Sequence, residues 1–271
     1  MSEKKMRYCR IWFVAFLWLP AIITAAGMLP SAAGSQGAAE AIRIPQRIIS
    51  FEHINQELVL KCDAGYLTIK AYADNIIHVS YSLTRTKAAS LLWGIRAKPS
   101  EPKYRVESTA AAIRLAAGRL AVSVDRKTAQ PTFLDAKQNV LLVSTQYRLK
   151  DPQEPSSPGA CIHAEFRSSE EEAFYGPGEN PKSSAGRRGQ TISFPRNAES
   201  GGQEIVEIPL LLSSLRYGIV FNNPSRTTVT PGKEGLTSWD AESGTVLSYF
   251  VIYGETSEEI YKGFAFLTAR N

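Results

Sequence analysis

The sequence predicts an all-β fold, a sandwich of antiparallel strands followed by one short C-terminal helix. Short segments that alternate apolar and polar residues follow one another along most of the chain, separated by brief turns, which is typical of half-buried antiparallel strands. No long helical period, glycine-rich nucleotide motif or strand–helix–strand spacing interrupts them. With 271 residues, 44% of them hydrophobic and 21% charged, the chain is composed like a globular protein. It is long enough to bury a core without a disulfide or a metal.

The predicted strands begin near residue 43 and continue to residue 253. The segment 66–72 alternates clearly, and a turn at 73–75 leads directly into 76–81. The other predicted strands are 42–44, 47–49, 57–61, 112–115, 120–124, 140–143, 162–166, 204–214, 217–222 and 245–253. The Pro/Ser-rich segment 151–159 is interpreted as a loop, because strands resume immediately after it. Residues 43–255 are therefore predicted to form one β-sandwich domain.

The C-terminal segment 256–271 changes to a helical pattern. Thr256 and Glu259 have the spacing of a capping box, in which each side chain bonds the other residue's backbone N–H. Ile260, Phe264 and Leu267 then recur at helical spacing and form one apolar stripe. We expect this segment to be a connector helix that docks its stripe on a further domain, a catalytic barrel absent from the chain.

Residues 1–33 have the features of an export signal. The first ten residues carry four basic side chains and one acidic side chain, and residues 11–29 are apolar throughout. Small residues follow, as they do at signal-peptidase sites. The prediction is a periplasmic or extracellular protein. An uncleaved anchor is the alternative, because the apolar run is nearly long enough to span a bilayer, and the protein would contact a membrane only in that case.

The charge distribution argues against a nucleic-acid partner. The formal net charge is +5, of which +3 belongs to the first ten residues. The remaining +2 is spread over interspersed charges of both signs, whereas nucleic-acid binding needs a clustered basic face.

Two cysteines, Cys62 and Cys161, follow the export segment. Export makes a disulfide between them chemically reasonable, and two unpaired thiols are the alternative. The sequence leaves both open because the Cα separation decides whether two cysteines can bridge.

Six segments, in this order, resemble glycoside hydrolase family 31, the family of α-glucosidases and α-xylosidases. They are 173–179 (similar to F-Y-G-L-G-E), 187–189 (R/K-G), 208–219 (I-P-F-L-L-S-S-x-G-Y-G), 221–225 (F/W-x-N-P), 248–254 (D-Y-Y-F-I-Y-G) and 260–268 (the helix ending in L-T-G). Pro177 and Ala269 depart from the family pattern. The resemblance implies the family's N-terminal domain, a galactose mutarotase-like β-sandwich, without its catalytic barrel.

The resemblance also implies where chemistry should be sought. In the family, the nucleophile and the general acid are carboxylates of the barrel, so we expect no catalytic residue, metal or cofactor in this chain. A hairpin of the N-terminal domain reaches the substrate, and its matching positions are Phe194, Arg196 and Asn197. The ring would stack on a sugar and the polar side chains would bond its hydroxyls, although the family more often has tryptophan and aspartate there. Glu170–Glu172 are expected to be a solvated charge run, and Asp240 to lie in a turn.

The three histidines are expected to be structural. We place His53 in a loop and His78 and His163 in strands, and no spacing matches a zinc motif. Tight turns are expected at Gly176 and Gly218.

Three functions remain after these observations. The leading one is a non-catalytic N-terminal domain of a family 31 hydrolase, truncated or split from a (β/α)8 barrel, with an α-linked oligosaccharide such as an α-glucoside or α-xyloside as ligand. The alternative is a stand-alone exported sugar-binding module, for which Trp93 and Trp239 are the only tryptophans after the export segment. The third is an active mutarotase-type epimerase, which needs a histidine–carboxylate pair on one sheet face that the sequence does not indicate.

Overall fold

The computed structural model describes residues 42–43, 45, 47–54, 57–85, 94–100, 102–150, 161–176, 186–194, 198–200, 203–205 and 209–269, with backbone alone for 42–43, 198–200 and 203–205. All of them belong to one unit that begins at residue 40. The predicted export signal, residues 1–33, lies outside the described residues. Within the described part of the chain, no helix is long and apolar enough to cross a bilayer.

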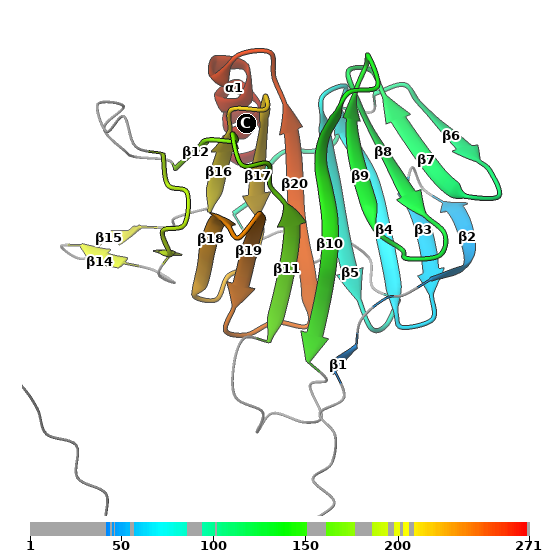
Figure 1. The fold of residues 1–271 in the computed structure, drawn as a ribbon, viewed down its shortest axis with the longest axis horizontal. Helices are drawn as coiled ribbons and strands as arrows, with labels where there is room; N and C mark the ends of the chain where they lie inside the picture. The colour runs from blue at the N-terminus through cyan, green and yellow to red at the C-terminus, as the bar shows by residue number, and fades with distance from the viewer. Residues whose placement is uncertain are drawn as a thin grey trace, which may run out of the picture. The chain divides into compact units, whose positions relative to one another are not determined.

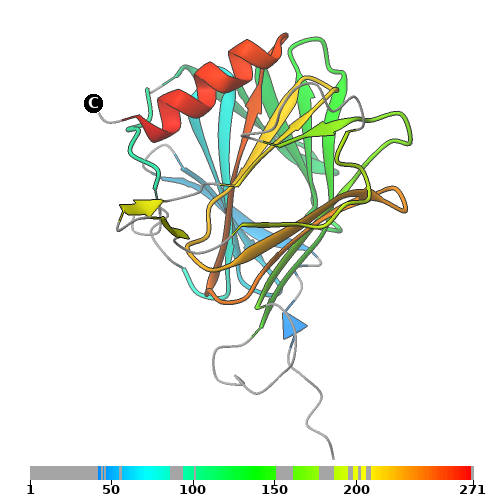
Figure 2. The same cartoon turned by 90° about the vertical axis from the view of Figure 1, so that its left-hand side faces the viewer.

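Two antiparallel sheets face each other and form the sandwich that the sequence predicts (Figures 1 and 2). The ten-stranded sheet has the order β13 (Ile192–Phe194), β18 (Thr227–Lys233), β19 (Leu236–Ala241), β11 (Ile162–Arg167), β10 (Val140–Lys150), β9 (Pro131–Asp135), β8 (Leu120–Asp125), β7 (Ala112–Ala117) and β6 (Tyr104–Ser108), with β1 (Ile42–Arg43) paired to β10. The eight-stranded sheet has the order β12 (Phe174–Tyr175), β16 (Leu210–Ser213), β17 (Tyr217–Phe221), β20 (Val246–Tyr253), β5 (Ile76–Ser82), β4 (Tyr66–Ala73), β3 (Glu57–Cys62) and β2 (Ile48–Ile54).

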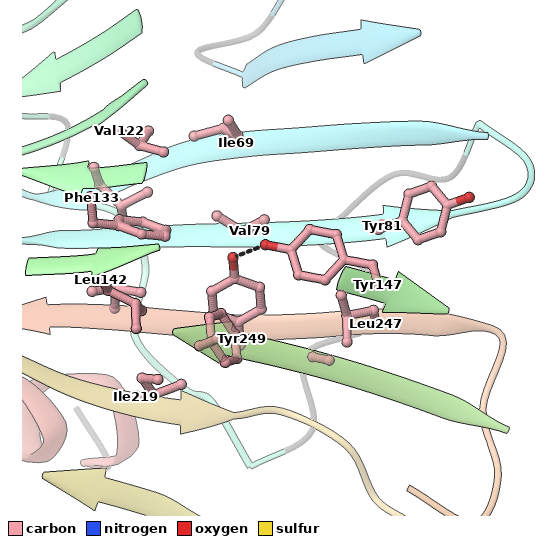
Figure 3. Packing of buried hydrophobic residues seen from close by; sticks show 14 of the residues in the cluster. Ile69, Val79, Tyr81, Val122, Phe133, Leu142, Tyr147, Ile219, Leu247 and Tyr249 are labelled. Atoms are coloured by element: carbon pink, nitrogen blue, oxygen red, sulfur yellow. Dashed lines mark hydrogen bonds between the residues drawn. The ribbon is translucent and has the colours of Figure 1, made fainter. Parts of the chain in front are cut away.

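The main core lies between the sheets and is built by the alternation that the sequence shows. In β7, for example, Ile113 and Leu115 are fully buried while Ala112, Arg114 and Ala116 are half-buried. In this core the hydroxyl groups of Tyr147 and Tyr249 bond to each other among aliphatic and aromatic side chains (Figure 3). Burial of both hydroxyls is tolerated because each has the other as a hydrogen-bond partner, one as donor and one as acceptor.

The helix α1 (Ser257–Thr268) packs on the opposite face of the eight-stranded sheet, over β17 and β20 (Figure 2). In β20 the side chains of Tyr249 and Val251 enter the main core, whereas those of Phe250 and Ile252 join a second cluster beneath α1. One of the two hydrogen bonds of the predicted capping box is confirmed: the Thr256 hydroxyl accepts from the backbone N–H of Glu259.

The far end of α1 is bonded to an irregular segment of the chain. The backbone N–H groups of Arg96 and Ala97 both donate to the carbonyl oxygen of Leu267, at 2.9 and 3.2 Å. Carbonyl groups at the end of a helix have no intrahelical partner, and segment 94–100 supplies the missing hydrogen-bond donors for the carbonyl of Leu267.

Several local predictions are wrong. His53 lies in β2 and not in a loop. The predicted strand 204–214 is two strands, β15 (Gln203–Ile205) and β16, and Pro209, which has no N–H to donate to a ladder, precedes the second. Gly218 lies inside β17, and the positive φ in that hairpin belongs to Arg216, at 68°.

Candidate functional site

The hairpin that the sequence assigns to sugar contact emerges from β13, which pairs with β18 at the edge of the ten-stranded sheet. Its own strands, β14 (Ala198–Ser200) and β15, pair antiparallel with each other only. Arg196 and Asn197 lie outside the described residues, so their sugar contacts stay a prediction.

Phe194, the third predicted contact, lies at the base of this hairpin in the core. Its side chain is 8% exposed, and its ring is nearly parallel to that of Trp239, with centroids 6.4 Å apart and 14° between the planes. Trp239 stacks in turn on Phe221 at 5.3 Å. Phe194 therefore anchors β13, the strand that precedes the hairpin, and a contact between its ring and a sugar stays a prediction. The alternation of Ile192, Ser193 and Phe194 is the signal that could have indicated an inward ring.

The three residues assigned to barrel docking do something else. Ile260 and Leu267 are 1% and 0% exposed in the cluster on the eight-stranded sheet, and Phe264 packs against the same cluster. The prediction that this stripe docks on a separate barrel is wrong. The apolar stripe of α1 packs instead on the apolar outer face of β17 and β20, because an amphipathic helix buries its apolar side against an adjacent apolar surface.

Two glycines make this helix packing close. A methyl group on Gly218 would lie 2.7 Å from Cγ2 of Ile260, and one on Gly263 would lie 2.6 Å from Cγ2 of Ile252. Both glycines therefore remove atoms where helix and strand approach. This steric role replaces the turn that the sequence suggested for Gly218.

The segment that resembles F-Y-G-L-G-E enters the structure as β12. Phe174 is fully buried in the main core, whereas Tyr175 is exposed on the edge strand. Before it, Glu170 and Glu171 are exposed as predicted, but Glu172 is 2% exposed. The prediction of a wholly solvated charge run is therefore wrong for Glu172.

The buried carboxylate of Glu172 is satisfied by hydroxyl donors. It accepts hydrogen bonds from Ser213 Oγ and, at 2.5 Å, from the hydroxyl of Tyr217. Burial first, and then the charge of Glu172, raises the pKa of Tyr217 well above its ordinary value, so this hydroxyl keeps its proton. Glu172 thus ties the segment before β12 to β16 and β17.

The element that resembles R-G supports the same segment from the other side. Arg188 Nη1 donates to the carbonyl oxygens of Ser169 and Glu172, at 2.6 and 3.1 Å. The backbone N–H of Arg187 donates to the carbonyl of Phe174. Two segments of the resemblance therefore contact each other, which explains structurally why both belong to one pattern.

His78 is buried and uncharged. Its Nε2 lies 2.8 Å from Ser248 Oγ, and its ring stacks on Phe250 with centroids 4.4 Å apart. Burial, and then the charge of Lys70, lowers the pKa of His78 to about 3. A histidine in this state holds strands together and is unsuited to acid–base chemistry near neutral pH.

A histidine–carboxylate pair that the sequence did not reveal joins β11 and β19. His163 and Asp240 face each other in register, and His163 Nδ1 donates to Asp240 Oδ1 at 2.8 Å. The other ring nitrogen, Nε2, is buried 4.0 Å from Oε2 of Glu165. Because Nε2 does not reach the surface, the pair orients side chains and is not placed to exchange a proton with a ligand. Asp240 lies in a strand and not in a turn, and the partners are 77 positions apart, so the sequence carries no local signal of the pair.

The described residues hold no group of three or more His, Cys, Asp or Glu side chains that could bind a metal. Cys62 and Cys161 are free thiols in the structure, one buried and one half-buried. The disulfide, which the sequence left open, is therefore not formed here.

Comparison with known proteins identifies the domain. Residues 66–229 match the family described as the glycosyl hydrolase 31 N-terminal galactose mutarotase-like domain. An α-xylosidase of Saccharolobus solfataricus is 27% identical over 209 residues, which cover 74% of this chain and 28% of the α-xylosidase.

Solved structures share the fold. A dextranase of Flavobacterium johnsoniae from family 31, complexed with isomaltotriose, superposes with a TM-score of 0.70 at 18% identity, over 83% of this chain and 28% of that one. A family 31 α-xylosidase from a soil metagenome, complexed with xylose, gives 0.66 at 23% identity, over 81% and 34%. The chain thus spans about a third or less of these relatives. It belongs to glycoside hydrolase family 31, through the family's N-terminal galactose mutarotase-like domain.

Proposed function

We propose that this chain is a non-catalytic N-terminal domain that works with a (β/α)8 catalytic barrel in the hydrolysis of α-glucosides or α-xylosides. The observation that carries the proposal is the family match over residues 66–229, in a chain that spans 28% of the α-xylosidase. The α-xylosidase and dextranase relatives support α-linked oligosaccharides as the substrate class.

Within this proposal, the hairpin 195–205 supplies sugar contacts through Arg196 and Asn197. Phe194 fixes the end of β13, the strand that leads into this hairpin, because its ring is packed against Trp239 in the core. A loop on a rigid base places polar groups more reproducibly than a loop without one.

The barrel would dock on the outer side of α1, because the inner side is already covered. Tyr261 and Phe266 are 44% and 38% exposed on that helix, which are high values for large apolar side chains. These two residues replace Ile260, Phe264 and Leu267 as the proposed contact.

The test is thermal unfolding of the chain with and without a family 31 barrel from the same genome. Docking is expected to raise the melting temperature, because a partner that binds only the folded state stabilises it. Replacing Tyr261 and Phe266 by alanine should remove the rise. Val140→Ala should retain it, because Val140 is an apolar side chain on the ten-stranded sheet that is even more exposed, at 56%.

Activity provides the second measurement. The chain alone should release no nitrophenol from nitrophenyl α-xyloside or α-glucoside, and release by the purified chain would contradict a non-catalytic role. No melting shift together with saturable oligosaccharide binding would favour the stand-alone sugar-binding module instead.

We also propose that the protein is exported, on the strength of the basic and apolar pattern of residues 1–33. Cell fractionation with N-terminal sequencing tests this. A mature terminus after the small residues that follow the apolar run indicates cleavage, an intact terminus in the membrane fraction indicates an anchor, and an intact cytoplasmic protein contradicts export.

A further inference from the structure

The outer face of the ten-stranded sheet carries a polar hollow that the proposed function does not use. Phe166 and Trp239 point into the core, so their strand neighbours Glu165 and Ser238 point outward. The hollow lies over β18, β19 and β11, which are adjacent in the sheet (Figure 1), and has a volume of about 300 Å³. Hydroxyl and charged side chains line it around one leucine: Glu165, Thr191, Thr230, Lys233, Glu234, Leu236 and Ser238.

A side chain from the neighbouring strand β10 orients Glu165, and His163 of the same strand, β11, lies beside it. Thr145 Oγ1 on β10 donates to its Oε1 at 2.7 Å. Nε2 of His163, a ring that Asp240 fixes from β19, lies 4.0 Å from Oε2. The carboxylate is thus oriented before a ligand arrives, which reduces the ordering cost of binding.

Glu165 also keeps acceptor capacity. A carboxylate offers about four lone-pair positions, and one hydrogen bond from Thr145 leaves others open. The Glu165 side chain is 23% exposed, so a ligand in the hollow can reach it.

The lining indicates the chemistry of the ligand. One cationic side chain, Lys233, and two carboxylates, Glu165 and Glu234, line the hollow, so neither sign of charge is concentrated enough to select a phosphate or a polycation. The hydroxyls of Thr191 and Thr230 lie 3.0 Å apart and can each donate or accept. Half-buried Leu236 adds one apolar contact. A neutral ring with hydroxyl edges and a C–H face matches this combination.

We propose that this hollow binds one pyranose unit of a neutral saccharide, with Glu165 accepting from adjacent sugar hydroxyls and Lys233 donating to another. The proposal rests on the carbohydrate role proposed above, but it locates a second contact, on side chains distinct from Arg196 and Asn197. It makes the domain a sugar-binding surface in its own right.

The experiment is isothermal titration calorimetry of the full chain with methyl α-D-xylopyranoside and methyl α-D-glucopyranoside. Saturable binding is expected with a dissociation constant on the order of a millimolar, because a monosaccharide makes few contacts. Glu165→Gln should weaken binding about tenfold, since it replaces charge-assisted hydrogen bonds by neutral ones. Ser238→Phe should abolish it by filling the hollow.

Glu107→Gln is the matched control, since Glu107 lies on β6 at the far edge of the same sheet and should leave binding unchanged. Thr230→Val, which removes a hydroxyl at constant volume, should weaken binding several-fold and replaces Ser238→Phe if that variant does not fold. No saturable heat with the folded wild-type chain overturns the proposal, as does equal binding by wild type and Glu165→Gln. Because these titrations use the chain without a barrel, their failure is distinguishable from failure of barrel docking.

Discussion

Arg119 and Glu259 connect the two sheets through the start of α1: Arg119 Nη1 donates to Glu259 Oε2 at 2.8 Å. Arg119 lies in the turn between β7 and β8 of the ten-stranded sheet, and Glu259 lies in the first turn of α1 on the other sheet. The same carboxylate oxygen accepts from the backbone N–H of Glu255 at 3.3 Å. A single carboxylate therefore both caps the helix and connects it to the far sheet.

The first prediction concerns the pH dependence of this pair. The hydrogen bond from Arg119, followed by that from the Glu255 backbone, lowers the pKa of Glu259. A lowered carboxyl pKa adds stability above its unfolded value of about 4.3, and that stability is lost as the pH falls through the folded value. Arg119→Gln should therefore lower the melting temperature slightly at neutral pH, and this effect should diminish as the pH falls below about 4. Arg105→Gln, which breaks an exposed ion pair remote from α1, is the control.

The second prediction concerns the close approach of α1 to the sheet. Gly263→Ala should lower the free energy of unfolding by about 1–2 kcal/mol, because the clash of the new methyl group with Ile252 outweighs a gain in helix propensity of about 1 kcal/mol. Chemical denaturation measures it. Gly176→Ala is the control, since a methyl group there meets no atom within 4 Å. Ile252→Leu, which removes Cγ2, should partly rescue Gly263→Ala, and a stability gain from Gly263→Ala alone would contradict the packing.

The third prediction concerns the tyrosine pair in the core. Tyr147→Phe or Tyr249→Phe should each cost about 1–3 kcal/mol, because each leaves the other hydroxyl buried without this partner. The double variant should cost less than the sum, since it removes both hydroxyls. Urea unfolding of the four proteins completes the cycle. Additive costs would show that the two hydroxyls are satisfied independently.

The fourth prediction concerns His78. Its pKa is lowered to about 3, against about 6.5 in the unfolded chain, so the unfolded state binds the extra proton first. Stability is fully present above about pH 6.5 and should fall by up to about 1.4 kcal/mol per pH unit as the pH drops towards 3. His78→Gln should flatten this slope, as measured by denaturation across the range. His53→Gln, on the surface strand β2, should leave it unchanged.

The fifth prediction concerns thiol reactivity. Burial, and then the charge of Asp63, raises the pKa of Cys62 to about 12, so about one molecule in ten thousand carries the thiolate at pH 8. Iodoacetamide should label the half-buried Cys161 before Cys62 in the folded protein, and both in denaturant. Peptide mapping by mass spectrometry distinguishes them. Equal labelling rates in the folded protein would mean that β3 opens readily.

The sequence by itself determined the features that depend on neighbours along the chain. Alternation predicted the strands on either side of the turn at 73–75, and the spacing of Thr256 and Glu259 predicted the start of α1. The ordered motifs between residues 173 and 268 predicted the family. Each of these signals is short in range, since a strand, a cap or a turn is decided by a few adjacent residues.

Only the tertiary structure decided which surfaces and side chains meet. The stripe of Ile260 and Leu267 was evident in the sequence, but the face that covers it was not, because that face is assembled from β17 and β20. In the same way, Glu172 is buried because Ser213 and Tyr217, more than forty residues along the chain, supply its hydrogen bonds. Contacts at such separations depend on how the strands and sheets are arranged, and the local alternation of apolar and polar residues does not predict that arrangement.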